Sequence, residues 1–290
     1  MPAFASLPPS SSTTPPTIAF IGGGNMASAI IGGLIQQGHP GERIVVVAPT
    51  EATRSRLSQD YGVRTLAAPS DALAQADLVV WAVKPQVLRE VAQGVRPYVS
   101  NALHLSLAAG IGSDALARWL GSERVIRAMP NTPALVGQGM TGLYARPATN
   151  DANTRAADRQ LVERALQPTG QLLWLEREDL IDAVVAVSGS GPAYVFYFLE
   201  AVEAQGVRMG LTPEQAHQLA VATFSGAAAL AAASGESPET LRQRVTSKGG
   251  TTFAAISSMQ ADGVAEAIQR GMAACRARAQ ELSVEFGRAD

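Results

Sequence analysis

A short apolar run that ends in three glycines and leads directly into a helix constrains this chain more than any other feature. The run TIAFIG, residues 17–22, is typical of a buried strand, and apolar residues at helical spacing follow from Met26 to Ile35. Between them, the sequence matches G-x-G-x-x-A, with Ala27 at the last position. This arrangement favours a dinucleotide-binding turn over an ordinary tight turn between a strand and a helix.

Each glycine of the turn has an expected task. Gly22 allows the tight turn, and Gly24, which lacks a Cβ, lets a pyrophosphate approach the backbone beside Gly23. The unpaired N–H groups at Asn25 and Met26, at the positive end of the helix dipole, then face the anion. We therefore predict that residues 22–26 hold the phosphates of a dinucleotide.

The rest of the N-terminal half alternates strands with helices. Short apolar runs occur at 43–48, 78–83, 103–107 and 124–128, each separated from the next by a segment of helix length. Such alternation predicts an α/β fold with a doubly wound parallel sheet covered by helices on both faces. The pattern fades after about residue 175, so we place a domain boundary there, with residues 17–176 forming the dinucleotide-binding domain.

The second half, residues 177–290, is expected to be all helix. Thr212 before Pro213 and Ser237 before Pro238 are helix starts of the usual kind. Many helix surfaces carry only alanine, and such helices often complete their core with a second copy of the chain, so we expect a dimer. The predicted helices are Asp179–Val187, Ala193–Met209, Pro213–Ala233, Pro238–Val245 and one from Thr251 to about Phe286.

Composition excludes several other classes. The first sixteen residues are rich in proline, serine and threonine and are expected to form a disordered tail without a targeting signal. A net charge of -2 gives no case for nucleic acid, no apolar run approaches the roughly twenty residues of a membrane span, and we expect no metal site. A single cysteine, Cys275, excludes an internal disulfide and fits the reducing cytoplasm.

The end of the second strand bears on which dinucleotide is bound. An NAD site commonly has an acidic residue there, whereas this chain has Ala48, followed by Thr50 and then by Arg54 and Arg56. A hydroxyl with nearby arginines suits the 2′-phosphate of NADPH. The alternatives stay open that the two arginines only solvate a helix face, and that Glu51 permits NADH.

Three further loops are candidates for ligand contact. Ala82, Val83, Lys84 and Pro85 follow a strand of the sheet and should border the cofactor, because ligands bind beyond the carboxyl ends of such strands. Asn131, in a proline-stiffened loop after the 124–128 strand, could bind the nicotinamide amide. The segment TSKGGTT, residues 246–252, precedes a helix and is either an anion-binding array of N–H groups or an ordinary capping loop.

Taken together, five segments resemble the pyrroline-5-carboxylate reductase family. They read IGGGNMASAIIGGL, AVKPQ, RAMPNTPALVGQGMTGLY, DLIDAVVAVSGSGPAYVF and SKGGTT, in order from about Thr17 to Phe286. The resemblance implies a Rossmann-like N-terminal domain and an all-helical C-terminal substrate-binding and dimerisation domain, with dimers that assemble further into decamers. It also implies NADPH-dependent reduction of 1-pyrroline-5-carboxylate to L-proline, the last step of proline biosynthesis.

The resemblance assigns roles to individual residues. Gly22–Met26 and Ala82–Pro85 would hold the cofactor, with Thr50 near the adenine-side ribose. Thr252 would face the ring nitrogen and orient it, with a secondary role in passing a proton from water, since a threonine hydroxyl is a poor acid. Further cofactor contacts would come from Ala108 and Ala109, and further substrate contacts from Glu178, Ser247, Gly250 and Thr251.

Two positions depart from the family pattern. Lys248 replaces the proline usual in the glycine loop, which adds a positive charge beside an anion site. The stretch APSD, residues 68–71, lacks an asparagine common in the family. Alternative readings are a reductase of another cyclic imine, a β-hydroxyacid dehydrogenase, or a non-catalytic NADPH-binding regulator. The dehydrogenase would need a helical lysine, whereas Lys84 and Lys248 are the only two lysines and both lie in loops.

Overall fold

The computed structural model describes residues 14–147 and 152–287. Most of the tail expected at residues 1–16 lies outside this range. The described residues form two compact units, one of residues 14–192 with 274–287 and one of residues 193–273. The first unit carries the sheet and the second is helical, so the fold class expected from the sequence is confirmed.

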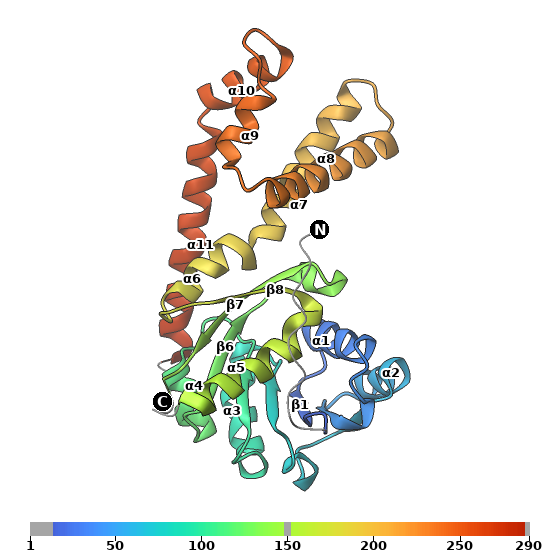
Figure 1. Cartoon of the computed structure of the whole chain (residues 1–290), viewed down its shortest axis with the longest axis vertical. Helices are drawn as coiled ribbons and strands as arrows, with labels where there is room; N and C mark the ends of the chain where they lie inside the picture. Colours follow the sequence, from blue (N-terminus) through green and yellow to red (C-terminus); the bar gives the residue numbers. More distant parts are fainter. Residues whose placement is uncertain (1–13, 148–151, 288–290) are drawn as a thin grey trace. The chain divides into compact units, whose positions relative to one another are not determined.

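An eight-stranded sheet forms the centre of the first unit (Figure 1). Its strands lie in the order β3-β2-β1-β4-β5-β6-β7-β8, and those from β3 to β6 are all parallel. The strands are β1 Ile18–Ile21, β2 Ile44–Val47, β3 Arg64–Leu66, β4 Leu78–Trp81, β5 Leu103–Ser106, β6 Val125–Met129, β7 Gly139–Ala145 and β8 Gly170–Trp174. Every residue of β1, β2, β4 and β5 is buried, as continuous apolar runs predict for a sheet covered on both faces.

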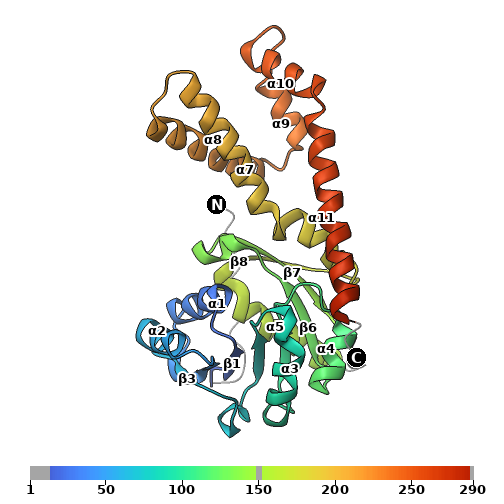
Figure 2. The same cartoon turned by 180° about the vertical axis from the view of Figure 1, so that it is seen from behind.

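Alternate residues of the strands face two separate cores. Phe20, Val46 and Val80 belong to one core with α1 Asn25–Gln36, α2 Glu51–Tyr61 and α5 Ala152–Leu166. Ile21, Val47 and Trp81 belong to the other with α3 Pro85–Val95 and α4 Ser113–Leu120 (Figure 2). The two-residue period of the strands therefore divides the helices between the faces of the sheet.

The sheet departs from the prediction at its far edge. β7 runs antiparallel to β6, and β8 then pairs parallel to β7. Only residues 130–138 connect β6 to β7, too few for the helical crossover that a parallel pair requires. The prediction of a wholly parallel sheet is wrong for these two strands. The sequence also gave no sign of β3, which is three residues long, or of β7 and β8, which begin with glycine.

The remaining helices agree with the expected ones, apart from two places. Between α6 and α7, where a gap after Val187 was expected, a five-residue π-helical segment, Val185–Gly189, continues the helix instead. Gly263, with a φ of +67°, separates α10 from α11, where one long helix was expected. Thr212 and Ser237 cap α8 and α9 as predicted, the former in a capping box with Gln215. The bounds are α6 Leu180–Val184, α7 Gly191–Arg208, α8 Pro213–Ser234, α9 Pro238–Arg244, α10 Thr251–Ala261 and α11 Val264–Gly287.

The compact units are divided differently from the boundary expected near residue 176. Val184 packs directly on Gly142 of β7, and Leu282 and Phe286 of α11 pack on Gly110. α6 and the end of α11 therefore belong to the unit that carries the sheet. An alanine-rich helical sequence does not reveal which of its turns return to an earlier part of the chain.

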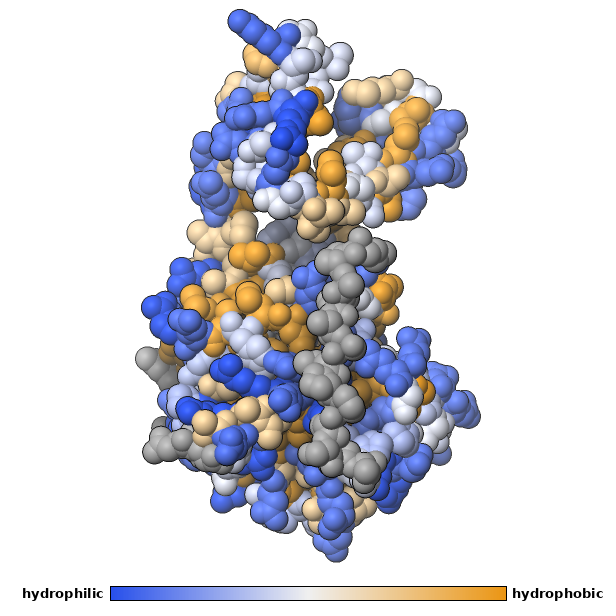
Figure 3. Space-filling view, in the orientation of Figure 1, coloured by the Kyte–Doolittle hydropathy of each residue, from blue (hydrophilic) through white to orange (hydrophobic). Residues whose placement is uncertain are grey.

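Helices α7 and α8 are unusually apolar at their surfaces. The segments Leu180–Arg208 and Pro213–Ser234 are long and apolar enough to cross a membrane, and only 11% of the most apolar window of each is buried. The expectation that no segment approaches this length and apolarity was therefore wrong. Figure 3 shows hydrophobic side chains exposed over the helical unit. The exposed large side chains of α7 and α8 include those of Phe196, Tyr197 and Leu219. Exposed apolar faces of this extent indicate a partner surface.

Candidate functional site

The first of the three glycines after β1 is fixed by the strand next to it. Gly22 has a φ of +102°, and a Cβ added there would lie 2.5 Å from the carbonyl oxygen of Ala82. Gly22 N–H donates to Val47, at the end of β2, and Ala82 N–H donates to Ile21. The turn therefore crosses the carboxyl ends of β2, β1 and β4, where the order of strands reverses direction and ligands bind in such sheets.

The next two glycines serve different purposes. A Cβ on Gly23 would collide with Leu57 and Thr53 of α2, at 2.7 and 2.8 Å, so this glycine allows α2 to pack closely. No atom of the described residues lies within 4 Å of a Cβ added to Gly24. The backbone at Gly24 therefore faces open space, as a bound pyrophosphate would require.

Helix α1 begins at Asn25 with an uncapped end. Gly24 is its N-cap, no side chain within the described ranges caps it, and its first turn contains no acidic residue. Ala27 is fully buried against the sheet. The free N–H groups and the positive end of the helix dipole are thus available to an anion, with Met26 half-buried beside them.

Two arginines of α2 reach the same region. Arg54 donates to the carbonyls of Ala48 and Pro49, at 2.8 and 2.6 Å, which places its guanidinium at the carboxyl end of β2. Arg56 donates to the carbonyl of Gly23, at 3.3 Å, and to Ser28 Oγ, at 3.0 Å. Neither arginine only solvates a helix face. The bracing of the glycine turn by Arg56 was not expected from the sequence.

The loop after β4 borders the glycine turn, and its expected contact with the cofactor stays a prediction. Ala82 and Val83 are the residues that a Cβ on Gly22 would touch. Lys84 is the exposed N-cap residue of α3, and Pro85 occupies the first turn of that helix. The contact of this loop with the turn therefore rests on backbone and apolar atoms.

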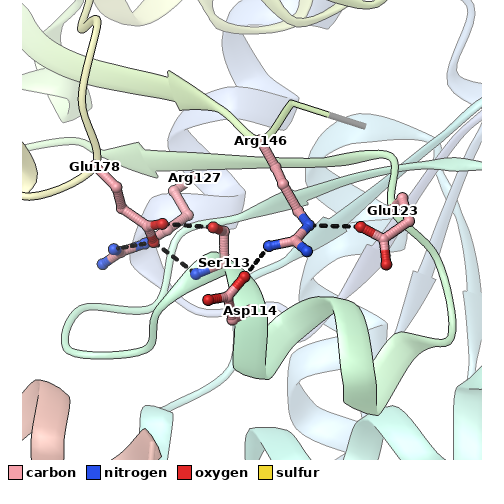
Figure 4. A network of polar contacts seen from close by, with 6 residues as sticks. All are labelled: Ser113, Asp114, Glu123, Arg127, Arg146 and Glu178. Atoms are coloured by element: carbon pink, nitrogen blue, oxygen red, sulfur yellow. Dashed lines mark hydrogen bonds and ion pairs between the residues drawn. The ribbon is translucent and has the colours of Figure 1, made fainter. Parts of the chain in front are cut away.

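A carboxylate joins the first residue of α4 to strand β6 (Figure 4). Glu178 accepts hydrogen bonds from Ser113 N–H, at 2.6 Å, from Ser113 Oγ, at 2.5 Å, and from Arg127, at 2.7 Å. The Arg127 side chain is only 6% exposed, and that of Glu178 is 28% exposed. Both line a cavity of about 290 Å³ together with Gly112, Arg118 and Asp182. Burial raises the pKa of the Asp182 carboxyl, and the charges of Arg127 and Arg276 oppose that shift.

Asn131 is engaged by its own protein. Its side-chain oxygen accepts from Met140 N–H at 2.9 Å, and its amide nitrogen donates to the carbonyl of Ser188 at 3.1 Å. The residue thus ties the loop after β6 to β7 and to the π-helical segment. One amide N–H is left for a ligand, so its expected contact with the nicotinamide stays a prediction.

In the helical unit, the segment before α10 forms a second uncapped helix start. Gly250 N–H donates to the carbonyl of Ser247 at 3.0 Å, and Gly249 has a φ of +75°, which closes a turn around Lys248. Gly250 is the N-cap of α10 and has no side-chain cap within the described residues. Neither Thr251 nor Thr252 caps the helix; both lie in its exposed first turn.

The three histidines lie outside these loops. Burial lowers the pKa of His104 to about 4, and its Nδ1 lies 3.2 Å from Trp81 Nε1, so the ring is neutral. Burial also lowers the pKa of His39, and His217 pairs with Glu203 on the surface of the helical unit. Within the part of the chain that the structure describes, no group of acidic, histidine and cysteine side chains could hold a metal.

Comparison with known proteins identifies the family. Residues 178–282 match a family model described as pyrroline-5-carboxylate reductase dimerisation, and residues 17–110 match one described as NADP oxidoreductase, coenzyme F420-dependent. The pyrroline-5-carboxylate reductase of Pseudomonas aeruginosa is 43% identical over 274 residues, which cover 94% of this chain and 98% of the relative.

Solved structures agree with this result. That of a pyrroline-5-carboxylate reductase from Coxiella burnetii is similar with a TM-score of 0.85 and 37% identity, covering 93% of this chain and 99% of that one. The pyrroline carboxylate reductase of Plasmodium falciparum, solved with NADP bound, has a TM-score of 0.81 and 25% identity, covering 92% and 98%. The chain described here therefore belongs to the pyrroline-5-carboxylate reductase family.

Proposed function

We propose that this protein reduces the C=N bond of 1-pyrroline-5-carboxylate to L-proline with NADPH. One observation carries the proposal: a chain similar to these reductases over more than nine-tenths of its length keeps two uncapped, glycine-led helix starts, at α1 and at α10. One start suits a dinucleotide pyrophosphate and the other a carboxylate. A regulator without catalytic activity would not need the second helix start, the one that suits a carboxylate.

The residues around the glycine turn fit an NADPH molecule. The open backbone at Gly24 and the α1 N-terminus suit the pyrophosphate, and Arg54 lies where the 2′-phosphate would be. Arg54 Nη1 is held by two carbonyls, while its other N–H groups can donate to a phosphate, together with the hydroxyl of Thr50. The remaining contacts would come from Ala82–Pro85, Ala108, Ala109 and Asn131.

The segment before α10 supports binding of the substrate carboxylate. Ser247 Oγ and the N–H groups at Gly250 and Thr251 would bind the two oxygens, and the α10 dipole favours the negative charge. This contact would hold the ring in one orientation. Catalysis would then depend mainly on positioning, because the cofactor, when bound, supplies the hydride itself.

Thr252 is assigned to the ring nitrogen. A protonated C=N bond accepts hydride much more readily, and the Thr252 hydroxyl would orient the nitrogen and relay a proton from water. Such a role does not require a histidine, in keeping with the neutral, buried ring of His104. Thr252→Ala should lower kcat/KM by about tenfold to a hundredfold, the loss of one hydrogen bond of ~1–3 kcal/mol. Thr252→Ser, which keeps the hydroxyl, is the matched control.

The activity is tested by following NADPH absorbance with pyrroline-5-carboxylate, then with NADH, and then with a six-membered cyclic imine. Turnover with the five-membered imine is expected. Turnover with only the six-membered imine would point to a different substrate, and no turnover with any imine would contradict the proposal. Arg54→Ala should weaken NADPH much more than NADH; equal effects would remove Arg54 from the 2′-phosphate site.

We further propose that the protein works in the cytoplasm as a homodimer whose dimers assemble into decamers. The exposed apolar faces of α7 and α8 fall within the segment that matches the dimerisation model, and a second copy would cover them. Light scattering after gel filtration measures the mass directly. A stable monomer at micromolar concentration would contradict this part of the proposal.

A further inference from the structure

Glu178 stands out because its carboxylate is already used by the protein itself. Oε1 accepts from Ser113 N–H and from Arg127, and Oε2 accepts from Ser113 Oγ (Figure 4). A carboxylate offers about four acceptor sites, so three are filled without any ligand. A substrate contact, the role that family resemblance implied, would have to compete with these bonds.

One of these bonds, to Ser113 N–H, supplies the cap that the start of α4 lacks. Its N-cap is Gly112, which has no side chain, and no local side chain of the described residues caps the helix. Glu178, 65 residues further along the chain, caps it instead through Ser113 N–H. The negative carboxylate also lies at the positive end of the α4 dipole.

Arg127 fixes the carboxylate from the other side. It lies in the middle of β6, in register with Ser106 of β5 and Tyr144 of β7, and its side chain is almost fully buried. A buried guanidinium needs an anionic partner. Since β6 is a rigid element of the sheet, Arg127 fixes the position of Glu178 relative to the strand. Glu178 in turn fixes the start of α4.

The segment held in this way is the β5–α4 loop, residues 107–112. Its first residues are held by Trp81 and Ser106, through the N–H groups of Leu107 and Ala108. Its middle packs on α11 at Gly110, which has a φ of +72°. Glu178 fixes the remaining end. The loop, of sequence LAAGIG, has no polar side chain, so it can contact a ligand only through its shape and backbone.

We propose that Glu178 is a positioning residue, which holds the β5–α4 loop in place against the nicotinamide half of NADPH, and that it does not bind the substrate. This inference rests on the proposed function for the identity of the cofactor. The loop follows β5, next to β4 at the carboxyl edge of the sheet, the same edge as the glycine turn. A displaced loop would weaken contacts with the nicotinamide half and leave the adenosine half unaffected.

The test compares two ligands on the purified full-length protein. NADPH fluorescence gives the affinity for the whole cofactor, and adenosine 2′,5′-bisphosphate reports the adenosine half alone. Glu178→Gln should raise the Kd for NADPH about tenfold, as expected for a lost charge-assisted hydrogen bond, with the bisphosphate Kd unchanged. Ser113→Ala should also raise the Kd for NADPH, by a smaller factor, and should likewise leave the bisphosphate Kd unchanged.

Glu176→Gln is the matched control, because Glu176 is an exposed carboxylate two residues away. If Glu178→Gln leaves Arg127 unpaired and unfolds the protein, Ser113→Ala still tests the inference, because it removes only the bond to Oε2. Unchanged NADPH affinity in folded Ser113→Ala protein would then overturn it. A rise in the KM for pyrroline-5-carboxylate at saturating NADPH, with the NADPH Kd unaltered, would overturn it too.

The measurement is separate from the proposed activity. Binding of NADPH can be followed whether or not pyrroline-5-carboxylate is turned over. If wild-type protein binds NADPH without reducing the imine, the proposed reaction fails, while the role of Glu178 is still decided by the two affinities. Wild-type protein that binds the bisphosphate but not NADPH would overturn the positioning role, because the loop would then have no nicotinamide to contact.

Discussion

Two glycines of the turn after β1, only two residues apart, should respond to the same substitution in opposite ways. In Gly22→Ala, the new Cβ would lie 2.5 Å from the carbonyl oxygen of Ala82, and the φ of +102° is one that alanine rarely adopts. The strained backbone costs about 1–3 kcal/mol and the forced displacement of β4 about as much again, so the fold should lose roughly 2–6 kcal/mol.

Gly24→Ala should leave the fold nearly unchanged. Its φ of -75° and ψ of -173° suit alanine, and no atom of the described residues lies within 4 Å of the new methyl group. Alanine is a poorer N-cap residue than glycine, which lowers the free energy of unfolding, but it also restricts the unfolded chain, which raises it. The two effects should cancel to within about 1 kcal/mol. The methyl would instead occupy the space that a pyrophosphate needs, so the Kd for NADPH should rise at least about tenfold, or ~1.4 kcal/mol.

Urea unfolding and NADPH fluorescence titration separate the two effects. Gly22→Ala should give little soluble protein or a much lower unfolding midpoint, and Gly24→Ala a midpoint close to wild type with weak binding. The control is Gly94→Ala in α3, where an added Cβ also meets no described atom and no ligand is expected. Wild-type NADPH affinity in Gly24→Ala, or wild-type stability in Gly22→Ala, would refute the reasoning.

Three further predictions concern stability. Because burial lowers the pKa of His104 from 6.5 to about 4, the unfolded chain binds a proton in that window that the folded chain does not. The free energy of unfolding should therefore fall by about 2 kcal/mol as the pH is lowered from 7 to 5, whereas this histidine does not reduce it above pH 6.5. His104→Asn should lose that part of the pH dependence, and an identical pH profile for both proteins would contradict the prediction. Thr212→Ala removes the capping box of α8 and should lower the free energy of unfolding by about 1 kcal/mol, whereas Thr212→Ser should not. Lys248→Pro should raise it by about 0.4–1 kcal/mol, since proline suits the position before Gly249 in this turn. The KM for the imine should stay within about threefold, because an exposed charge contributes little; a larger rise would assign Lys248 to substrate binding.

The parts of the fold that were predictable depend on local sequence. β1, β2, β4 and β5 are uninterrupted apolar runs, and the starts of α8 and α9 carry Thr212 and Ser237 before proline. Backbone conformation at such places is set by a few neighbouring residues. The glycine turn belongs to the same class, because the absence of a Cβ at Gly22 and Gly24 can be read directly from the sequence.

Features that depend on distant residues could not be predicted. The reversal of β7 and the return of α6 and α11 to the sheet are decided by packing between segments far apart in the chain. The bonds of Glu178 with Ser113 and Arg127 are of this kind too. Arg127 gave the one available signal, since a charged residue inside an otherwise apolar strand needs a partner, although the sequence does not say which one.

The closing of α11 over Gly110 has a consequence for synthesis of the protein. Phe286 packs against the core shared by α3 and α4, and Leu282 lies beside it on the β5–α4 loop. A ribosome makes these two residues after all eight strands. The nucleotide-binding unit, although its sheet is made first, therefore lacks these contacts at Gly110 until residues 282–286 have also emerged from the ribosome.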